Sequence, residues 1–146
     1  MIPYYISLGA PEMRPPDRHG FTISGFPTRP RSTGRVSIVV NGIVENYKEL
    51  RAELQQRGHV LRSETDAEVI AHLIEENLNG DLVQAVQTSL GRVEGSYALG
   101  VMSADFPGIL VAARNHSPLV LGTDDQGNSY LASDTPALLP YTDQVI

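Results

Sequence analysis

The sequence predicts a mixed α/β fold in which helices cover one face of an antiparallel sheet. Apolar residues recur at helical spacing through residues 47–90, which predicts helices there. From residue 96 onward, short apolar runs alternate with turn-rich segments, and no helix signal separates the paired runs. Strands joined by short turns pair antiparallel, because a parallel connection needs a long crossover. The second half of the chain is therefore expected to form hairpins.

The composition is that of a globular domain with an acidic main body. The 146 residues are enough for one core, and 19% of them are charged. Residues 36–146 carry six basic and fifteen acidic side chains, so we expect no nucleic-acid binding, which needs a positive surface. We also expect no membrane span, no secretory leader and a cytoplasmic location. The chain holds no cysteine, which excludes a thiol nucleophile within it.

Residues 1–34 differ from the rest and contain six of the ten prolines. Each proline fixes its own φ and disfavours helix in the residue before it. This pattern predicts an irregular, weakly basic arm. A proline-rich peptide ligand is the alternative interpretation.

Regular structure is expected from residue 35. Residues 35–40 read as a largely buried strand that ends at Asn41-Gly42. Asn-Gly by itself predicts a hairpin turn. A glycine at a strand end also lets a backbone N–H turn toward a ligand, and the Asn41 amide would add a second donor of an oxyanion hole. The local pattern leaves both interpretations open.

The helices and strands that follow have recognisable ends. Asn46 is predicted to cap the first helix, with Glu49 completing a capping box and Gly58 just past its end. Residues 59–61 are predicted as a short strand, and residues 63–66 as a loop that caps the second helix. The third helix is expected to begin at Asp81.

Four strands and a last short helix complete the prediction. The strands cover residues 96–102, 109–113, 119–122 and 129–132. The helix is expected to start at residues 133–136, where Ser133 and Asp134 would cap it, and to run through Leu139. The apolar residues that form the stripes of the three earlier helices are Tyr47, Leu50, Leu54, Val69, Ile70, Leu73, Ile74, Leu78, Leu82, Val83, Val86 and Leu90.

Four segments together resemble one family in order and spacing. They are residues 41–47 (NGIVENY), 63–70 (SETDAEVI), Arg114 with 117–119 (SPL), and 132–138 (ASDTPAL). They resemble the N-terminal glutaminase domain of glutamine–fructose-6-phosphate aminotransferase (isomerizing), or glucosamine-6-phosphate synthase, which is a class II glutamine amidotransferase. The resemblance is closer to this enzyme than to amidophosphoribosyltransferase or asparagine synthetase.

The resemblance implies an N-terminal-nucleophile fold, an α/β/β/α sandwich of antiparallel sheets, of which this chain would form a part. It implies that Asn41 and Gly42 are the oxyanion-hole pair and that Asp66 binds the α-ammonium of glutamine. From the residues alone, Asp66 reads as a helix cap worth about 1 kcal/mol. Arg114 reads as structural, paired with a buried acid. We interpret His59, His72 and His116 as surface or satisfied residues without metal-ligand spacing.

The chain departs from this family in several places. It has no Cys nucleophile, no Arg-Trp-Ala-Thr-His-Gly segment for the glutamine carboxylate, and Val40 where the family usually has His. We therefore expect residues 35–146 to be a partial glutaminase domain that does not hydrolyse glutamine alone. The alternatives are a non-catalytic glutamine-binding or regulatory module, and a half-enzyme completed in trans.

The departures also bear on cofactors, partners and assembly. No cofactor and no metal are expected. The expected partners are glutamine and a missing N-terminal half or sugar-phosphate isomerase domain. Sheet strands without their usual neighbours would leave open edges, so we also expect marginal stability, self-association or pairing with a separate N-terminal half.

Overall fold

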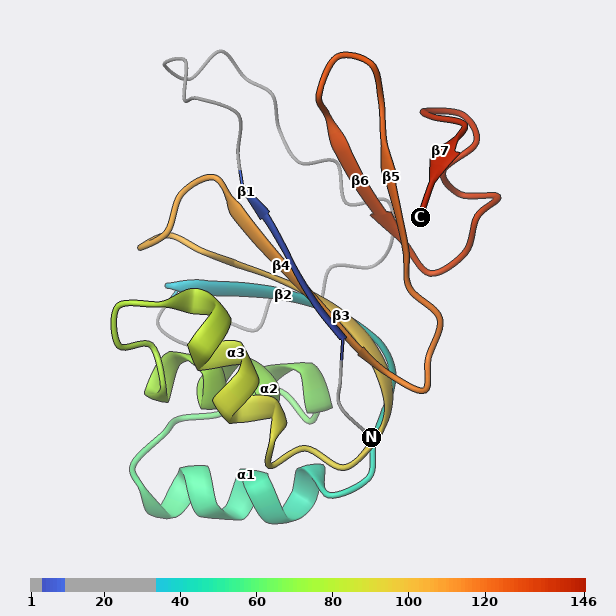
Figure 1. Cartoon of the computed structure of the whole chain (residues 1–146). Helices are drawn as coiled ribbons and strands as arrows, with labels where there is room; N and C mark the ends of the chain where they lie inside the picture. Colours follow the sequence, from blue (N-terminus) through green and yellow to red (C-terminus); the bar gives the residue numbers. More distant parts are fainter. Residues whose placement is uncertain (1–3, 10–33) are drawn as a thin grey trace.

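The computed structural model describes residues 4–9 and 34–146, which form two antiparallel sheets and three helices (Figure 1). The larger sheet has the strand order β1-β4-β3-β2 and the smaller one β6-β5-β7. The strands of the larger sheet are β1 (Tyr4–Gly9), β2 (Val36–Val44), β3 (Gly95–Ser103) and β4 (Ile109–Asn115). Those of the smaller sheet are β5 (Val120–Thr123), β6 (Ser129–Ala132) and β7 (Gln144–Val145). The predicted mixed α/β fold with antiparallel pairing is confirmed.

Three helices cover one face of the larger sheet (Figure 1). They are α1 (Tyr47–Gln56), α2 (Asp66–Glu76) and α3 (Leu82–Leu90). Helix α2 is the most deeply placed, because every residue from Ala67 to Glu75 is buried. None of the helices in the described part of the chain is both long and apolar enough to cross a membrane.

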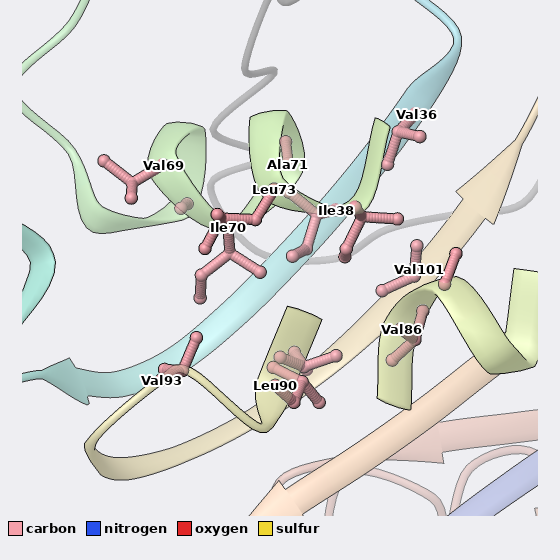
Figure 2. Close-up of a cluster of buried hydrophobic side chains, with 14 of the residues drawn as sticks. Val36, Ile38, Val69, Ile70, Ala71, Leu73, Val86, Leu90, Val93 and Val101 are labelled. Atoms are coloured by element: carbon pink, nitrogen blue, oxygen red, sulfur yellow. The ribbon is translucent and has the colours of Figure 1, made fainter. Parts of the chain in front are cut away.

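The main core lies between the helices and the larger sheet (Figure 2). Strand β2 alternates, with Val36, Ile38 and Val44 buried toward the helices and Ser37 and Asn41 exposed on the other face. Fully burying one such aliphatic side chain stabilises the fold by about 1.5–3 kcal/mol. The core side chains labelled in Figure 2 are Val36, Ile38, Val69, Ile70, Ala71, Leu73, Val86, Leu90, Val93 and Val101.

The smaller sheet packs on the opposite face of the larger one. The contact is close at Gly100 of β3, where an added Cβ would lie 3.3 Å from the Leu131 side chain of β6. The predicted hairpin of residues 119–122 and 129–132 is confirmed as β5 and β6, with Val120 opposite Ala132. The described residues therefore form one helical layer and two sheets.

Two predicted helix ends are confirmed. Asp81 caps α3, because its Oδ1 accepts from the backbone N–H groups of Val83 at 2.8 Å and Gln84 at 3.2 Å. Gly58 follows α1 with a φ of 91°. The N–H of the next residue, His59, donates to the Leu54 carbonyl at 3.0 Å, which is the usual hydrogen bond of a glycine-ended helix.

The predicted capping box at α1 is wrong. Asn46 stands at the N-cap position but makes no capping hydrogen bond from its side chain. Its amide instead donates to the Arg92 carbonyl at 2.8 Å and accepts from the Glu94 N–H at 3.0 Å. Asn46 therefore ties the start of α1 to the turn before β3, which is a contact between segments almost fifty residues apart.

Two other predicted elements are also wrong. Residues 59–61 form no strand, because the backbone here leads into a loop that is bound to α2. The helix predicted through Leu139 is a series of turns, in which the Leu138 N–H donates to the Thr135 carbonyl at 2.9 Å. Asp134 still acts as a local cap, since it accepts from the Ala137 N–H at 3.1 Å. Strand β7 was not predicted.

The irregular arm predicted for residues 1–34 is wrong at one place. Tyr4–Gly9 forms β1, which pairs with β4 so that Tyr4 lies opposite Arg114 and Gly9 opposite Ile109. The rest of this prediction falls on residues 1–3 and 10–33, outside the described residues.

The hairpin turn predicted from Asn41-Gly42 is wrong, because both residues lie inside β2. Gly42 pairs with Tyr97 and has a φ of 126°, where a Cβ would lie 2.1 Å from the Ser96 carbonyl oxygen. Gly95 has the reciprocal geometry, with a φ of 133° and a Cβ position 2.2 Å from the Ile43 carbonyl oxygen. The two glycines allow β2 and β3 to approach more closely than side chains permit.

Substituting Gly95 tests this close approach. We expect Gly95→Ala to lower the free energy of unfolding by about 3 kcal/mol, because backbone strain adds to a clash with a carbonyl that has no room to move. The control is Gly127→Ala, which has a φ of 83° but nothing near its Cβ position, and should cost about 1–2 kcal/mol. Urea unfolding measures both variants. Equal losses would contradict the proposed clash.

Candidate functional site

Two of the three predicted site residues, Gly42 and Asp66, lie along the outer edge of β2, which is the last described strand of the larger sheet. Two hydrogen bonds show which backbone groups of β2 bond to β3 and which face away from it. The Glu45 N–H donates to the Glu94 carbonyl, and the Ala104 N–H donates to the Arg35 carbonyl, both at 2.8 Å. Odd-numbered residues therefore bond to β3, and the N–H groups of Gly42 and Val44 face away from β3, on the side of β2 where no described strand pairs.

Asp66 lies on the same edge. Its Oδ2 accepts from the Val44 N–H at 3.2 Å, which links the first residue of α2 to the end of β2. Two residues of a strand span about 7 Å, so the Gly42 N–H lies about 7 Å along the edge from the Val44 N–H that Asp66 binds. The structure thus brings together an outward-facing strand N–H and a half-buried carboxylate. The interpretation of Asp66 as the helix cap is wrong, because Thr65 holds the N-cap position.

Asn41 lies next to this edge but on a different surface. Its side chain is exposed on the sheet face opposite the helices, in a cross-strand row with Ala98 and Arg114. Arg114 is exposed as well. The structure therefore places Gly42 and Asp66 along one edge, while Asn41 projects from the adjoining face.

Glu68 holds the loop that precedes Asp66, and sequence reasoning missed it. Its carboxylate accepts from the Arg62 N–H at 2.8 Å, from the Ser63 N–H at 2.7 Å and from the Ser63 hydroxyl at 2.7 Å. The Arg51 guanidinium of α1 donates to the Ser63 carbonyl from the other side. The Thr65-x-x-Glu68 spacing is that of a capping box and could have indicated this residue.

The environment of Glu68 keeps it ionised although its side chain is buried. Burial disfavours the charged carboxylate, but the hydrogen bonds from Arg62 and Ser63 outweigh it, so the pKa of Glu68 lies below its usual value. A buried carboxylate with several hydrogen bonds fixes the geometry of its donors. Glu68 is therefore a residue that positions the start of α2, and Asp66 with it.

Two of the histidines contact each other. His59 and His72 meet through their Nδ1 atoms at 2.9 Å, with the His59 Nε2 also 3.3 Å from Glu76. Burial, followed by the proximity of His59, lowers the pKa of His72. The expectation that each histidine is exposed or satisfied is wrong for the buried His72 Nε2, which has no partner among the described residues. His116 is exposed, as expected. The described residues contain no group of three or more side chains that could hold a metal ion.

Comparison with known proteins identifies the family. A family model for the glutamine amidotransferase domain matches residues 27–140. The chain belongs to this glutamine amidotransferase family. The matched residues include all three helices and every described strand except β1 and β7.

Individual relatives agree with the family assignment. The amidotransferase chain is 55% identical over 115 residues to glutamine–fructose-6-phosphate aminotransferase (isomerizing) of Symbiobacterium thermophilum, covering 79% of this chain and 19% of that relative. It is 51% identical over 128 residues to the enzyme of the same name from a strain of Thermus thermophilus, covering 84% and 21%. The chain thus spans about a fifth of the length of the curated relatives it matches.

A solved structure agrees with the fold. The structure of the allosteric regulatory enzyme of purine biosynthesis matches 76% of this amidotransferase chain and 24% of its own, at 25% identity and a TM-score of 0.64. The fold is therefore of the N-terminal-nucleophile amidotransferase type, as the resemblance in sequence implied.

Neutralising Glu68 tests its positioning role. We expect Glu68→Gln to lower the free energy of unfolding at neutral pH by about 1–3 kcal/mol, because three donors lose a charged acceptor. A carboxylate with a lowered pKa stabilises the fold above its unfolded pKa of about 4.3, and this contribution disappears as pH falls through the folded value. The difference from the parent chain should therefore shrink below about pH 4.

The control for this substitution is Glu64→Gln. Glu64 is almost fully exposed and lies 3.4 Å from Arg51, so its loss should cost less than about 1 kcal/mol at any pH. Urea unfolding measured as a function of pH compares the two variants. A pH-independent loss in Glu68→Gln would contradict the ionised state of this carboxylate.

Proposed function

We propose that residues 35–146 are part of the glutaminase domain of a glutamine–fructose-6-phosphate aminotransferase. In this proposal glutamine is the ligand of the completed domain, where Gly42 and Asn41 donate to the oxygen of its side-chain amide and Asp66 binds its α-ammonium. Attack on the amide carbon turns that oxygen into an anion. A fixed donor to such an oxyanion typically contributes about 3–4 kcal/mol to the transition state.

The edge of β2 supports this assignment, and it is the observation on which the proposal rests. The Gly42 N–H and the Asp66 carboxylate face the same open edge, about two strand residues apart. Five bonds separate the ammonium nitrogen and the side-chain oxygen of glutamine, which span about 5–6 Å when extended. One glutamine molecule therefore has the length to reach both groups.

The proposed roles of the two groups differ in charge. Asp66 is the first residue of α2 and presents a carboxylate there. An ionised carboxylate attracts the ammonium group, whereas a strand N–H favours the carbonyl oxygen. The amide end of glutamine would therefore point toward Gly42, and Asn41 would have to reach it from the adjoining face.

Catalysis needs an attacking atom in addition to these groups. The chain has no cysteine, and family members use an N-terminal cysteine as the nucleophile. Removing the nucleophile from a comparable hydrolase lowers the rate by about 10⁶. We therefore propose that the chain by itself is inactive and that activity would need a partner that supplies a nucleophile, such as a separate N-terminal half.

Glutamate release tests this proposal. Purified chain incubated with glutamine should release no glutamate above the blank without protein. Asp66→Asn prepared in the same way serves as the contamination control, because a contaminating glutaminase would be present in both samples. Release by the parent chain that is absent from Asp66→Asn would overturn the proposed inactivity.

A non-catalytic glutamine-binding module is the second candidate, and the adjacency of Asp66 and the Gly42 N–H favours it. Calorimetric titration with glutamine separates the two. An inactive fragment without a complete pocket should give no binding heat. A binding module should give heat that Asp66→Asn abolishes and that Asp81→Asn, which alters only the cap of α3, leaves unchanged. Heat that survives Asp66→Asn would contradict the proposed role of Asp66.

A further inference from the structure

We propose that the open edge of β2 pairs with the same edge of a second copy of this chain. The two β2 strands would run antiparallel, with Val40 of one copy opposite Val40 of the other. The larger sheets of the two copies would then join into one continuous sheet. Such an interface is symmetric, because the same residues face each other from both sides.

Apart from Asp66 at one end, the edge lacks the features that normally prevent this kind of pairing. Proteins protect edge strands with charged side chains, proline, bulges or short length. Strand β2 has nine residues from Val36 to Val44, and none is charged or proline. Its pairing with β3 is continuous from Val36–Ser103 to Val44–Gly95, without a bulge. Among the described residues no strand lies beyond it.

The hydrogen-bonding groups of the edge limit the possible registers. The N–H and C=O groups of even-numbered residues face outward, as the bonds of Arg35 and Glu45 to β3 require. An antiparallel partner must therefore place even residues opposite even residues. Centring the pair on Val40 does so, because Ile38 then lies opposite Gly42 of the second copy.

Charge complementarity selects this register from the allowed ones. Arg35 and Glu45 flank the uncharged strand at equal distances from Val40, and both are exposed. Arg35 also pairs with Asp105 of its own chain, so it would have to share or exchange this partner in the dimer. In the proposed register Arg35 of each copy lies opposite Glu45 of the other, so two opposite-charge pairs close the interface. A shift by two residues would break both pairs. Surface ion pairs contribute little to affinity, but they fix register and exclude wrong partners.

Asp66 sets the length of the pairing. In each copy it accepts from the Val44 N–H, so neither Val44 can donate to the other chain. The full exchange of hydrogen bonds is therefore confined to three residue pairs at the centre. These are Ile38 with Gly42, Val40 with Val40 and Gly42 with Ile38, which together exchange about six hydrogen bonds. The pairing would use the Gly42 N–H, but it requires no ligand and does not depend on the proposed function.

A charge-swap experiment tests the proposal. Sedimentation velocity of the parent chain should show a dimer that forms with increasing concentration. Arg35→Glu would place Glu opposite Glu45, and Glu45→Lys would place Lys opposite Arg35, so each variant alone should be more monomeric than the parent. An equimolar mixture of the two should recover the dimer, because both ends of the mixed pair then join opposite charges.

Two controls accompany the charge swap. Arg35 also pairs with Asp105 within its own chain, so circular dichroism must confirm that each variant is folded. Glu49→Lys makes the same charge change on an exposed position of α1 and should dimerise like the parent chain. A monomeric parent at all concentrations would overturn the proposal, and would leave the edge available to an extended segment of another protein. Association that the mixture does not restore would also overturn it.

A distance measurement tests the register independently. Because the chain has no cysteine, Ser37→Cys can carry a single spin label. In the proposed register Ser37 lies opposite Ile43, so the two labelled positions are six strand residues apart, about 20 Å. Parallel pairing would bring them to about 5 Å. Either that shorter distance or no dipolar coupling in the dimer would overturn the antiparallel pairing centred on Val40.

Discussion

The attachment of α2 to β2 is the constraint on which the rest of this structure depends. Helix α2 is buried from Ala67 to Glu75, so it cannot shift without exposing much of the core. Its first residue, Asp66, bonds the Val44 N–H, and Glu68 in the same turn bonds the backbone of the preceding loop. These two carboxylates fix the start of the helix against the sheet edge.

This attachment gives the candidate site a preorganised geometry. Gly42 is held in place by its pairing with Tyr97, and Asp66 by its bond to the same strand. A donor and a carboxylate that need no rearrangement bind a ligand at lower entropic cost than groups on mobile loops. The same open edge has a second consequence, because an outward-facing N–H can donate either to a ligand oxygen or to the carbonyl of another strand. The proposed ligand binding and the proposed strand pairing would therefore use the same backbone group.

The elements that the sequence predicted correctly are those set by local patterns. The apolar spacing of α2 and α3, the cap at Asp81 and the glycine after α1 each involve residues only a few positions apart. The errors involve contacts between distant segments. Asn46 looks like a cap in sequence, but the turn at Arg92 and Glu94 takes its amide. Asn41-Gly42 looks like a turn, but β3 continues beside it.

For the candidate site too, some features could be predicted from the sequence and others only from the structure. The resemblance of the motifs to the amidotransferase family pointed to Asn41, Gly42 and Asp66, whereas the residue patterns themselves predicted an α/β fold with antiparallel sheets. Only the folded structure showed that Gly42 is required by the Ser96 carbonyl, that Asp66 bonds Val44 and that Glu68 anchors the loop. Each of these depends on which backbone groups pair across the sheet. That choice is made by the packing of the whole core, so no local stretch of sequence records it.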